Sequence, residues 1–475
     1  MTDLAARSVG QLSELIETGE LSPVELTEAV LDNVSRHDDT LKAYIEVYRD
    51  DAMTAARNAE TEIASGHYRG PLHGIPMGIK DNIYFADRVT TMGSKIHGDF
   101  VSETNATVVD RLSDAGVVFL GKLNMHEYAL GGTTDNQFHG TCRNPWDLTM
   151  SPGGSSGGSG AALASNMTIA ALGTDTSGSI RIPAALCGIV GLKPTYGRVS
   201  RFGCFPEAWT LDHIGPMTRT VADAAIVLDA ISGYDARDPG SLNQPPTRTA
   251  GQLASTLDGV VIGIDEEFFF TDVDDEIDRC VRDGIEALRR QGATIKSISI
   301  PGLSNCEWAL TIIDTSETST VHHANLRDRP EDYSDDVRLL LECGELPSAV
   351  EYLEAQQLRR HLRSEMQRAF DGVDVLVAPT LPTRTPLIGK TTTTINGRDV
   401  DAIESLMRLV GPASLLGLPS LSVPCGVAKG LPVGMQVIGP ALGEQKVLNT
   451  GHVLELSEPM GSMRATAYLD GTIPG

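Results

Sequence analysis

The sequence of 475 residues lacks several features that would each define a class of protein. It contains no run of about 18 apolar residues, so a membrane-spanning helix is not expected. Its seven cysteines never form a C-x-x-C pair, which argues against a disulfide framework and against a zinc site. The opening residues, MTDLAARSVG, lack the basic-then-apolar pattern of a signal peptide. We therefore expect a cytoplasmic protein that has no membrane contact and no metal.

Positive charge and aromatic side chains are also scarce. Asp and Glu number 63 against 38 Lys and Arg, only nine of which are lysines, and the formal charge is −25. Such acidity argues against direct binding to nucleic acid or to an anionic membrane surface. Aromatic residues make up 5% of the chain, whereas hydrophobic residues make up 41% and glycines number 48. This composition predicts a large core connected by many tight loops, at a length typical of a complete enzyme.

Several catalytic signatures are missing. His126-Glu127 is not followed by the second histidine of H-E-x-x-H, no lysine has a serine three residues before it, and neither phosphate-loop pattern occurs. The pattern G-x-S-x-G does occur, twice, within residues 153–158. A nucleophile elbow needs a buried strand immediately before it, but here the turn-like NPWDLTMSP precedes. A Ser-His-Asp hydrolase, with its base among the 11 histidines, remains an alternative chemistry.

The most distinctive part of the chain runs from Ser151 to Thr195. It contains the glycine- and serine-rich run GGSSGGSGAALA and, after a short apolar segment, the second small-residue turn TDTSGS. Small residues allow backbone N–H groups to approach a ligand closely. A flexible linker would not lead into apolar chain such as Ile180–Leu192. We therefore expect two adjacent loops that present hydroxyl groups to a catalytic centre.

Helical and strand patterns alternate on both sides of this stretch, which predicts one large α/β domain without internal repeats. Ser22-Pro23-Val24-Glu25 is a helix start signal. A short apolar strand, Ile75 to Ile79, places Lys80 at its end. The Pro-rich residues 233–258 indicate an internal boundary or a surface loop. Helices are expected at 8–36 with a break at Gly19, 50–65, 106–112, 221–231, 274–291 and 335–370, and strands at 117–120, 260–264, 294–300, 373–377 and twice within 418–438.

Several motifs together resemble the amidase signature family. GGSSGGSGAALA, GTDTSGSIRIPAALCGIVGLKPTYGRVS and GIPMGIKDN carry the resemblance, and GKLNMHEYALGG, RNPWD, TLDHIGPMTRT, GLPSLSVPCG and LPVGMQVIG extend it in order over nearly the whole chain. The resemblance implies an α/β/α sandwich with a large mixed β-sheet covered by helices, in a single domain over 1–475. Within it, the expected parts are an N-terminal helical region (1–65), a catalytic core (66–230), a variable substrate-side region (231–410), and C-terminal strands and a helix (411–475).

The resemblance also assigns roles to individual residues. Ser179 corresponds to the acyl-forming nucleophile, Ser155 to a proton-relaying serine preceded by a cis peptide bond, and Lys80 to the general base. The backbone N–H groups of Thr176, Ser177, Gly178 and Ser179 correspond to the oxyanion hole, with Ser177 standing where the family more often has glycine. The resemblance places Ser156, Asp175 and Arg181 in bracing positions, assigns Ala129, Gly131 and Trp209 to the substrate side, and implies no cofactor and no metal.

Elementary electrostatics sets a requirement for Lys80. A serine hydroxyl needs a base, and a lysine acts as one only when it is neutral. Holding an unperturbed lysine neutral at neutral pH costs about 4.6 kcal/mol. Burial beside Ile75 and Ile79 would reduce that cost, because burial disfavours the charged form. The sequence therefore predicts that Lys80 is shielded from water.

The resemblance leaves more than one function open, because the family includes the glutaminase component, the A chain, of a tRNA-dependent amidotransferase. In those proteins a Tyr, an Arg and an Asp hold glutamine; by motif register they fall here at Leu310 or Thr311, Leu339 or Leu340, and Met407. Apolar replacements would leave the charges of an amino acid unpaired. We therefore expect a stand-alone amidase for a small-molecule amide, a carboxamide or anilide, and the glutaminase component is the alternative. A non-catalytic scaffold is a third hypothesis, and a homodimer remains open.

Overall fold

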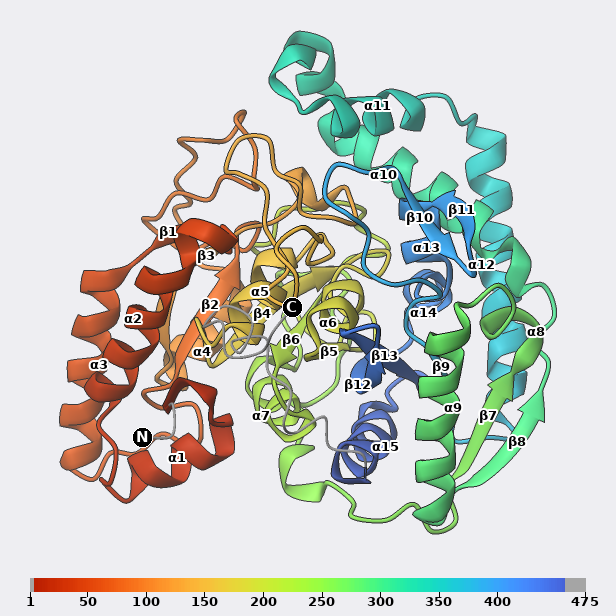
Figure 1. Ribbon diagram of the computed structural model, residues 1–475. Coiled ribbons are helices and arrows are strands. Elements are labelled where there is room, and N and C mark those ends of the chain that lie inside the picture. Colours follow the sequence, from red (N-terminus) through yellow and green to blue (C-terminus); the bar gives the residue numbers. More distant parts are fainter. Residues whose placement is uncertain (1–3, 458–475) are drawn as a thin grey trace.

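The computed structural model describes residues 4–457, which form an 11-stranded mixed sheet and a separate two-stranded hairpin (Figure 1). The order across the large sheet is β1-β3-β2-β4-β6-β5-β12-β13-β9-β7-β8. The strands are β1 (Tyr44–Val47), β2 (Pro76–Lys80), β3 (Val118–Leu123), β4 (Ala170–Asp175), β5 (Val190–Lys193), β6 (His213–Thr218), β7 (Val261–Asp265), β8 (Thr294–Ile298), β9 (Val375–Pro379), β12 (Ser420–Ala428) and β13 (Leu431–Ile438), and the hairpin pairs β10 (Thr392–Ile395) with β11 (Arg398–Asp401).

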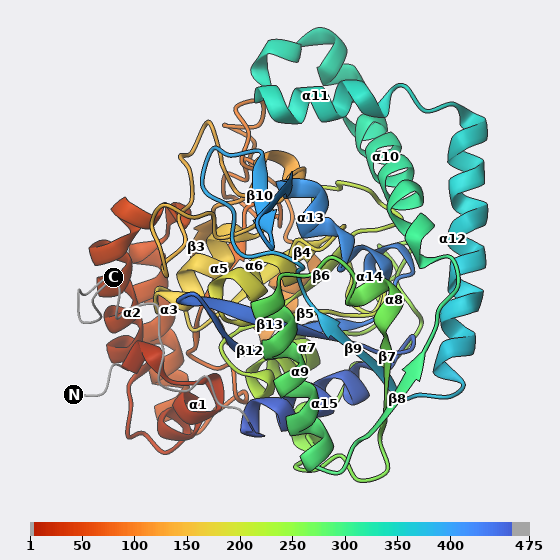
Figure 2. The ribbon, with the colours of Figure 1, turned by 45° about the vertical axis from the view of Figure 1, so that its right-hand side comes forward.

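Helices cover both faces of this sheet. The helices are α1 (Val9–Glu17), α2 (Pro23–Leu41), α3 (Arg49–Ala64), α4 (Thr107–Asp114), α5 (Gly157–Ala164), α6 (Arg181–Cys187), α7 (Val221–Ile231), α8 (Glu266–Phe269), α9 (Asp275–Arg290), α10 (Cys306–Asp328), α11 (Asp335–Gly344), α12 (Ala349–Phe370), α13 (Ala402–Arg408), α14 (Gly411–Leu415) and α15 (Glu444–Ser457). Helices α1–α3 lie at the β1 end, and α10–α12 extend from the upper right of the molecule (Figures 1 and 2).

Two adjacent residues of β13 show how the layers are arranged. A Cβ atom on Gly434 would lie only 2.7 Å from Ala185 of α6, whereas Met435 Cε would lie 2.6 Å from a Cβ on Gly284 of α9. Successive residues of a strand face opposite sides of a sheet. Helices α6 and α9 therefore pack on opposite faces, which gives the α/β/α sandwich expected from the sequence.

Strand pairing brings the ends of β2 and β4 to one edge. The two strands are parallel, with Met77 opposite Ala170 and Ile79 opposite Leu172. Every residue of both strands is buried. Because the carboxyl ends of parallel strands meet at the same edge, Lys80 at the end of β2 lies beside the last residues of β4. This edge holds the candidate site.

Most of the expected elements are present close to their expected ranges. The start signal at Ser22 is confirmed, since its side chain accepts hydrogen bonds from Val24 N–H and Glu25 N–H at 3.0 and 3.4 Å. The helical region expected over 335–370 is divided into α11 and α12. Residues 458–475 of the expected C-terminal part lie outside the described residues. Within residues 4–457, no helix is long and apolar enough to cross a membrane.

Other segments differ from the expectation. The glycine- and serine-rich run is not a loop throughout, because α5 begins at Gly157; a Cβ on Gly158 would lie 2.4 Å from Asn124 O, so only glycine permits this close packing. Strand β6 (His213–Thr218) is not among the strands expected from the sequence. The 23-residue α10 was not predicted, since its apolar positions show little helical periodicity and many of its residues are Thr and Ser.

A glycine at the β1–β3 contact provides a test of this packing. Gly121 has φ of +150°, and an added Cβ would lie 2.0 Å from Glu46 O. We expect Gly121→Ala to lower the free energy of unfolding by about 3 kcal/mol, because backbone would have to move. Chemical denaturation measures this change. Gly10→Ala in α1 is the matched control: no atom lies within 4 Å of the added Cβ, so stability should be unchanged or slightly higher.

Candidate active site

Lys80 is fully buried and contacts two hydroxyl groups. Its Nζ lies 2.7 Å from Ser155 Oγ and 2.7 Å from Thr174 Oγ1. Asn82 Nδ2 donates to the same Thr174 oxygen at 3.2 Å. Burial lowers the pKa of Lys80 to about 8, against an opposing effect of the Glu207 carboxylate. The amine is therefore shielded from water and is much easier to deprotonate than a surface lysine.

The loop that carries Ser155 is held from several sides. The Gly154–Ser155 peptide bond is cis, and Ser155 is fully buried. Thr134 Oγ1 donates to the Gly153 carbonyl at 2.9 Å, and His126 N–H donates to the Ser155 carbonyl at 3.1 Å. These contacts fix the backbone on both sides of the cis bond, so the hydroxyl group is positioned by rigid chain.

The turn after β4 carries Ser179 and lies against the Ser155 loop. Ser156 N–H donates to the Ser179 carbonyl at 3.2 Å, and Ser156 Oγ donates to the Thr174 carbonyl at 3.2 Å. Ser156 thus ties the two serine loops to each other.

Three of the four predicted oxyanion-hole donors are open. Within residues 4–457, the N–H groups of Thr176, Ser177 and Ser179 have no hydrogen-bond acceptor in the protein. Gly178 N–H, in contrast, donates to Asp175 Oδ1 at 3.0 Å. The free N–H groups can therefore serve an oxyanion, and Gly178 N–H instead shapes the turn.

A buried ion pair fixes the base of this turn. Arg181 Nε and Nη2 lie 3.0 and 3.1 Å from the two oxygens of Asp175, and both side chains are fully buried. Burial alone would raise the pKa of Asp175, but the charge and hydrogen bonds of Arg181 hold it below its usual value. Arg181 also donates to the Val410 carbonyl at 2.9 Å and to Ser414 Oγ at 2.7 Å. The pair connects the turn to α14 across the core.

Two buried carboxyl groups, those of Glu207 and Asp314, and the partly buried one of Asp212 surround the outer side of the turn. Thr176 Oγ1 lies 2.7 Å from both Glu207 Oε2 and Asp212 Oδ1, and Ser177 Oγ donates to Asp314 Oδ2. Burial raises the pKa of Asp212 to about 6, that of Asp314 to about 7 and that of Glu207 well above its usual value. A threonine hydroxyl has one proton to donate, so a protonated carboxyl must supply the second hydrogen bond. Glu207 and Asp212 therefore share one proton when both hydrogen bonds of Thr176 are made.

Sequence reasoning missed this carboxyl cluster, together with Thr174 and Asn82. Glu207 and Asp212 lie in PEAWTLDHIGP, where the sequence motifs pointed only to Trp209 as a site residue. Asp314 lies on α10, a helix that was not predicted, so its position beside Ser177 had no visible signal.

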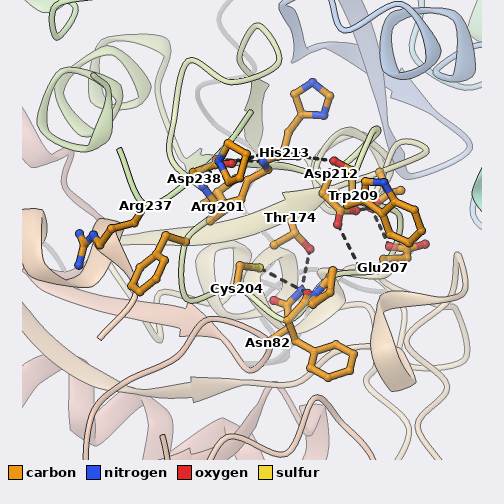
Figure 3. Close-up of a pocket in the computed structure, with 16 residues that line it drawn as sticks. Asn82, Thr174, Arg201, Cys204, Glu207, Trp209, Asp212, His213, Arg237 and Asp238 are labelled. Atoms are coloured by element: carbon orange, nitrogen blue, oxygen red, sulfur yellow. Dashed lines mark hydrogen bonds and ion pairs between the residues drawn. The ribbon is translucent and has the colours of Figure 1, made fainter. Parts of the chain in front are cut away.

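Glu207 and Asp212 line a cavity of about 210 Å³ (Figure 3), whose lining does not include Asp314, Lys80, Ser155 or Ser179. Trp209, assigned to the substrate side, lines this cavity and is 42% exposed. Ala129 and Gly131 do not line it: Ala129 is buried, and a Cβ on Gly131 would meet the His126 ring at 2.4 Å. The lining consists of Asn82, Thr174, Thr176, Arg201, Phe202, Cys204, Phe205, Pro206, Glu207, Trp209, Asp212, His213, Ile214, Arg237, Asp238 and Pro239.

Histidines near the site have structural contacts. His213 is buried, with Nδ1 3.1 Å from the Asp175 carbonyl and Nε2 3.1 Å from Lys193 Nζ. Burial lowers the pKa of His213 well below its usual value. His126 Nε2 lies 2.9 Å from Asp336 Oδ2. The described residues contain no group of three or more His, Cys, Asp or Glu side chains able to hold a metal ion.

Comparison with known proteins identifies the family to which the chain belongs. The Amidase family model matches residues 25–448, and the chain belongs to this family of amide-cleaving enzymes. It is 40% identical over 478 aligned positions to the A chain of the glutamyl-tRNA(Gln) amidotransferase of Roseiflexus castenholzii, with 95% of this chain and 96% of the relative covered.

Two solved structures show the same fold. One, described as a vestigial protein complex that reveals the evolutionary origins of an s-triazine catabolic enzyme, superimposes with a TM-score of 0.91 at 33% identity, covering 94% of this chain and 98% of the other. The second, a bacterial aryl acylamidase of the amidase signature family, gives a TM-score of 0.88 at 29% identity, with 99% of both chains covered.

Removing one member of the buried ion pair should be costly. We expect Arg181→Met to lower the free energy of unfolding by about 3–5 kcal/mol, because it leaves the Asp175 carboxylate buried without its counter-ion. Denaturant titration measures the loss. Arg338→Met is the matched control, since its ion pair with Asp335 on α11 is exposed and should contribute less than about 1 kcal/mol. Equal losses in both variants would contradict the bracing role of Arg181.

Proposed function

We propose that this chain is a stand-alone amide hydrolase that forms an acyl-enzyme on Ser179. The observation that carries the proposal is the contact of a water-shielded lysine with a serine, Lys80 Nζ to Ser155 Oγ at 2.7 Å. A buried lysine whose pKa is lowered is a base at moderate pH, and a serine needs such a base to become a nucleophile.

The proposed reaction passes one proton along two serines. Neutral Lys80 takes the proton of Ser155 as Ser155 takes that of Ser179, and Ser179 Oγ attacks the amide carbonyl. The negative charge on the carbonyl oxygen is stabilised by the open N–H groups of the turn, chiefly those of Thr176 and Ser177. The proton returns through Ser155 to the leaving nitrogen. A water molecule, activated along the same path, then releases the acid and restores Ser179.

The proposed substrate is a small carboxamide or anilide. Leu310 lies in the core, and Leu339 and Leu340 are 59% and 36% exposed on α11. Of the positions where the register places the three glutamine contacts, only Thr311 carries a polar group, and none carries a charge that could pair with the head group of glutamine. The close structural match to a protein named as an aryl acylamidase supports the same choice.

The alternative is the glutaminase component of a tRNA-dependent amidotransferase. The specific observation that favours it is the 40% identity to a protein named as the A chain of such an enzyme, over nearly the whole of both chains. A substrate panel separates the two functions. If the chain is a stand-alone amidase, the purified protein alone should hydrolyse simple aliphatic or aryl amides faster than glutamine. Glutamine hydrolysis that appears only with added partner proteins would support the alternative.

Labelling tests the assignment of the nucleophile. A fluorophosphonate should modify the native protein, and Ser179→Ala should abolish labelling and lower kcat by about a thousandfold or more. Mass spectrometry of the labelled peptide identifies the site. Ser165→Ala on the chain after α5 is the control, because the Ser165 hydroxyl donates to the nearby carbonyls of Ala161 and Ala162. Modification of a different serine would contradict the mechanism.

The protonation state of Lys80 predicts how kcat/KM depends on pH. Because the base must be neutral, kcat/KM should rise as pH increases through about 8, and below that value it should fall about tenfold per pH unit. Glu207→Gln should move this rise to lower pH, since the Glu207 carboxylate favours the charged amine. The exposed Glu354→Gln on α12 should leave the profile unchanged. A rise near pH 10, typical of a solvated lysine, would argue against Lys80 as the base.

A further inference from the structure

One carboxyl oxygen that faces the cavity in Figure 3 has no hydrogen-bond partner among residues 4–457. Glu207 is 5% exposed, and within residues 4–457 only its Oε2 makes a hydrogen bond, to Thr176, which leaves Oε1 free. Asn82 is 3% exposed; its Nδ2 donates to Thr174, while its Oδ1 is buried without a partner. Buried acceptors are normally satisfied, so a ligand that supplies donors is indicated.

The cationic side chains that line the cavity are already paired. Arg201 makes a bidentate contact with Asp238, at 3.1 Å from Nε and 2.7 Å from Nη2. Arg237 Nε donates to Asp235 at 3.1 Å, and its guanidinium lies over the Phe202 ring. An anionic ligand would therefore find no unpaired cation among the lining residues, whereas a cationic one would find an unsatisfied carboxyl oxygen.

The neighbouring acidic groups strengthen this preference. Asp212 contributes charge but no free acceptor, because its oxygens receive the N–H groups of Glu207 and Ala208 as well as the Thr176 contact. Asp314 stands behind Ser177 and raises the pKa of Glu207 further. A bound cation would favour the ionised form of these carboxyl groups.

We propose that the substrate carries a protonated amine, and that this ammonium group occupies the cavity with Glu207 Oε1 as its acceptor. The inference rests on the proposed amidase function and adds the substrate class. The partly exposed Trp209 ring at the same cavity suits a cation, which is attracted to the face of an indole. Glu207 is thus a specificity-determining residue.

Pairs of nearly isosteric amides test the charge preference. The pair N-acetylputrescine and N-pentylacetamide places the charge on the amine side, and the pair aminocaproamide and heptanamide places it on the acyl side. In at least one pair, kcat/KM should be about tenfold or more higher for the charged amide. The pair that shows the preference identifies which side of the scissile bond enters the cavity.

A variant of Glu207 tests whether the preference for charged amides arises in this cavity. Glu207→Gln keeps the shape of the side chain but removes its charge, so the charged-to-neutral ratio of kcat/KM should fall about tenfold. Glu354→Gln, an exposed carboxyl on α12, should leave the ratio unchanged. Thermal denaturation verifies that Glu207→Gln is folded, and in Ser179→Ala calorimetry should detect binding of butylammonium but not of pentanol.

The outcomes separate this inference from the function on which it rests. If the fluorophosphonate does not label Ser179, the hydrolase proposal fails. If Ser179 is labelled and amides are cleaved, but neutral amides react as well as charged ones in both pairs, only the substrate class is overturned. A charge preference that survives in Glu207→Gln would overturn the role of this cavity.

Discussion

The exclusion of water from Lys80 is the constraint on which the site depends. A lysine at the end of a fully buried strand loses hydration, and the loss favours its neutral form. The parallel pairing of β2 with β4 places Thr174 and the serine loops around the amine, so its contacts are with hydroxyl groups. A carboxylate in direct contact would hold the proton on the lysine; hydroxyl partners satisfy its hydrogen bonds without doing so.

The same turn is braced in two different ways. On its inner side, Asp175 and Arg181 form a charged pair whose partners satisfy each other, and the pKa of Asp175 is lowered. On its outer side, Glu207, Asp212 and Asp314 gather without a paired cation, and their pKa values are raised. The first arrangement holds the backbone in place. The second leaves carboxyl groups without a counter-ion next to a cavity, which is the arrangement expected where binding, rather than folding, supplies the counter-ion.

The sequence alone predicts the elements that depend on local residue patterns. The helix start at Ser22 and the strand that ends at Lys80 follow from caps and apolar runs, and the motifs identified the family. Elements that depend on tertiary packing were missed: α5 is helical because glycine lets it approach Asn124, and α10 has almost no amphipathic period. The carboxyl cluster was missed for the same reason, because Asp314 reaches Ser177 across 137 positions of sequence.

The charge of Glu207 acts both on Lys80 and on an ammonium group bound in the cavity. When Glu207 is ionised, its carboxylate raises the pKa of Lys80 and favours the protonated amine, whereas a bound ammonium would offset that charge and favour the neutral amine, which is the proposed base. A cation at this place therefore acts on the reaction even without touching Ser179. An uncharged amide of the same size would fill the cavity but would leave Lys80 in the field of the carboxylate. Selectivity for charge would then arise in kcat as well as in binding, because the correct substrate alters the base that activates the nucleophile.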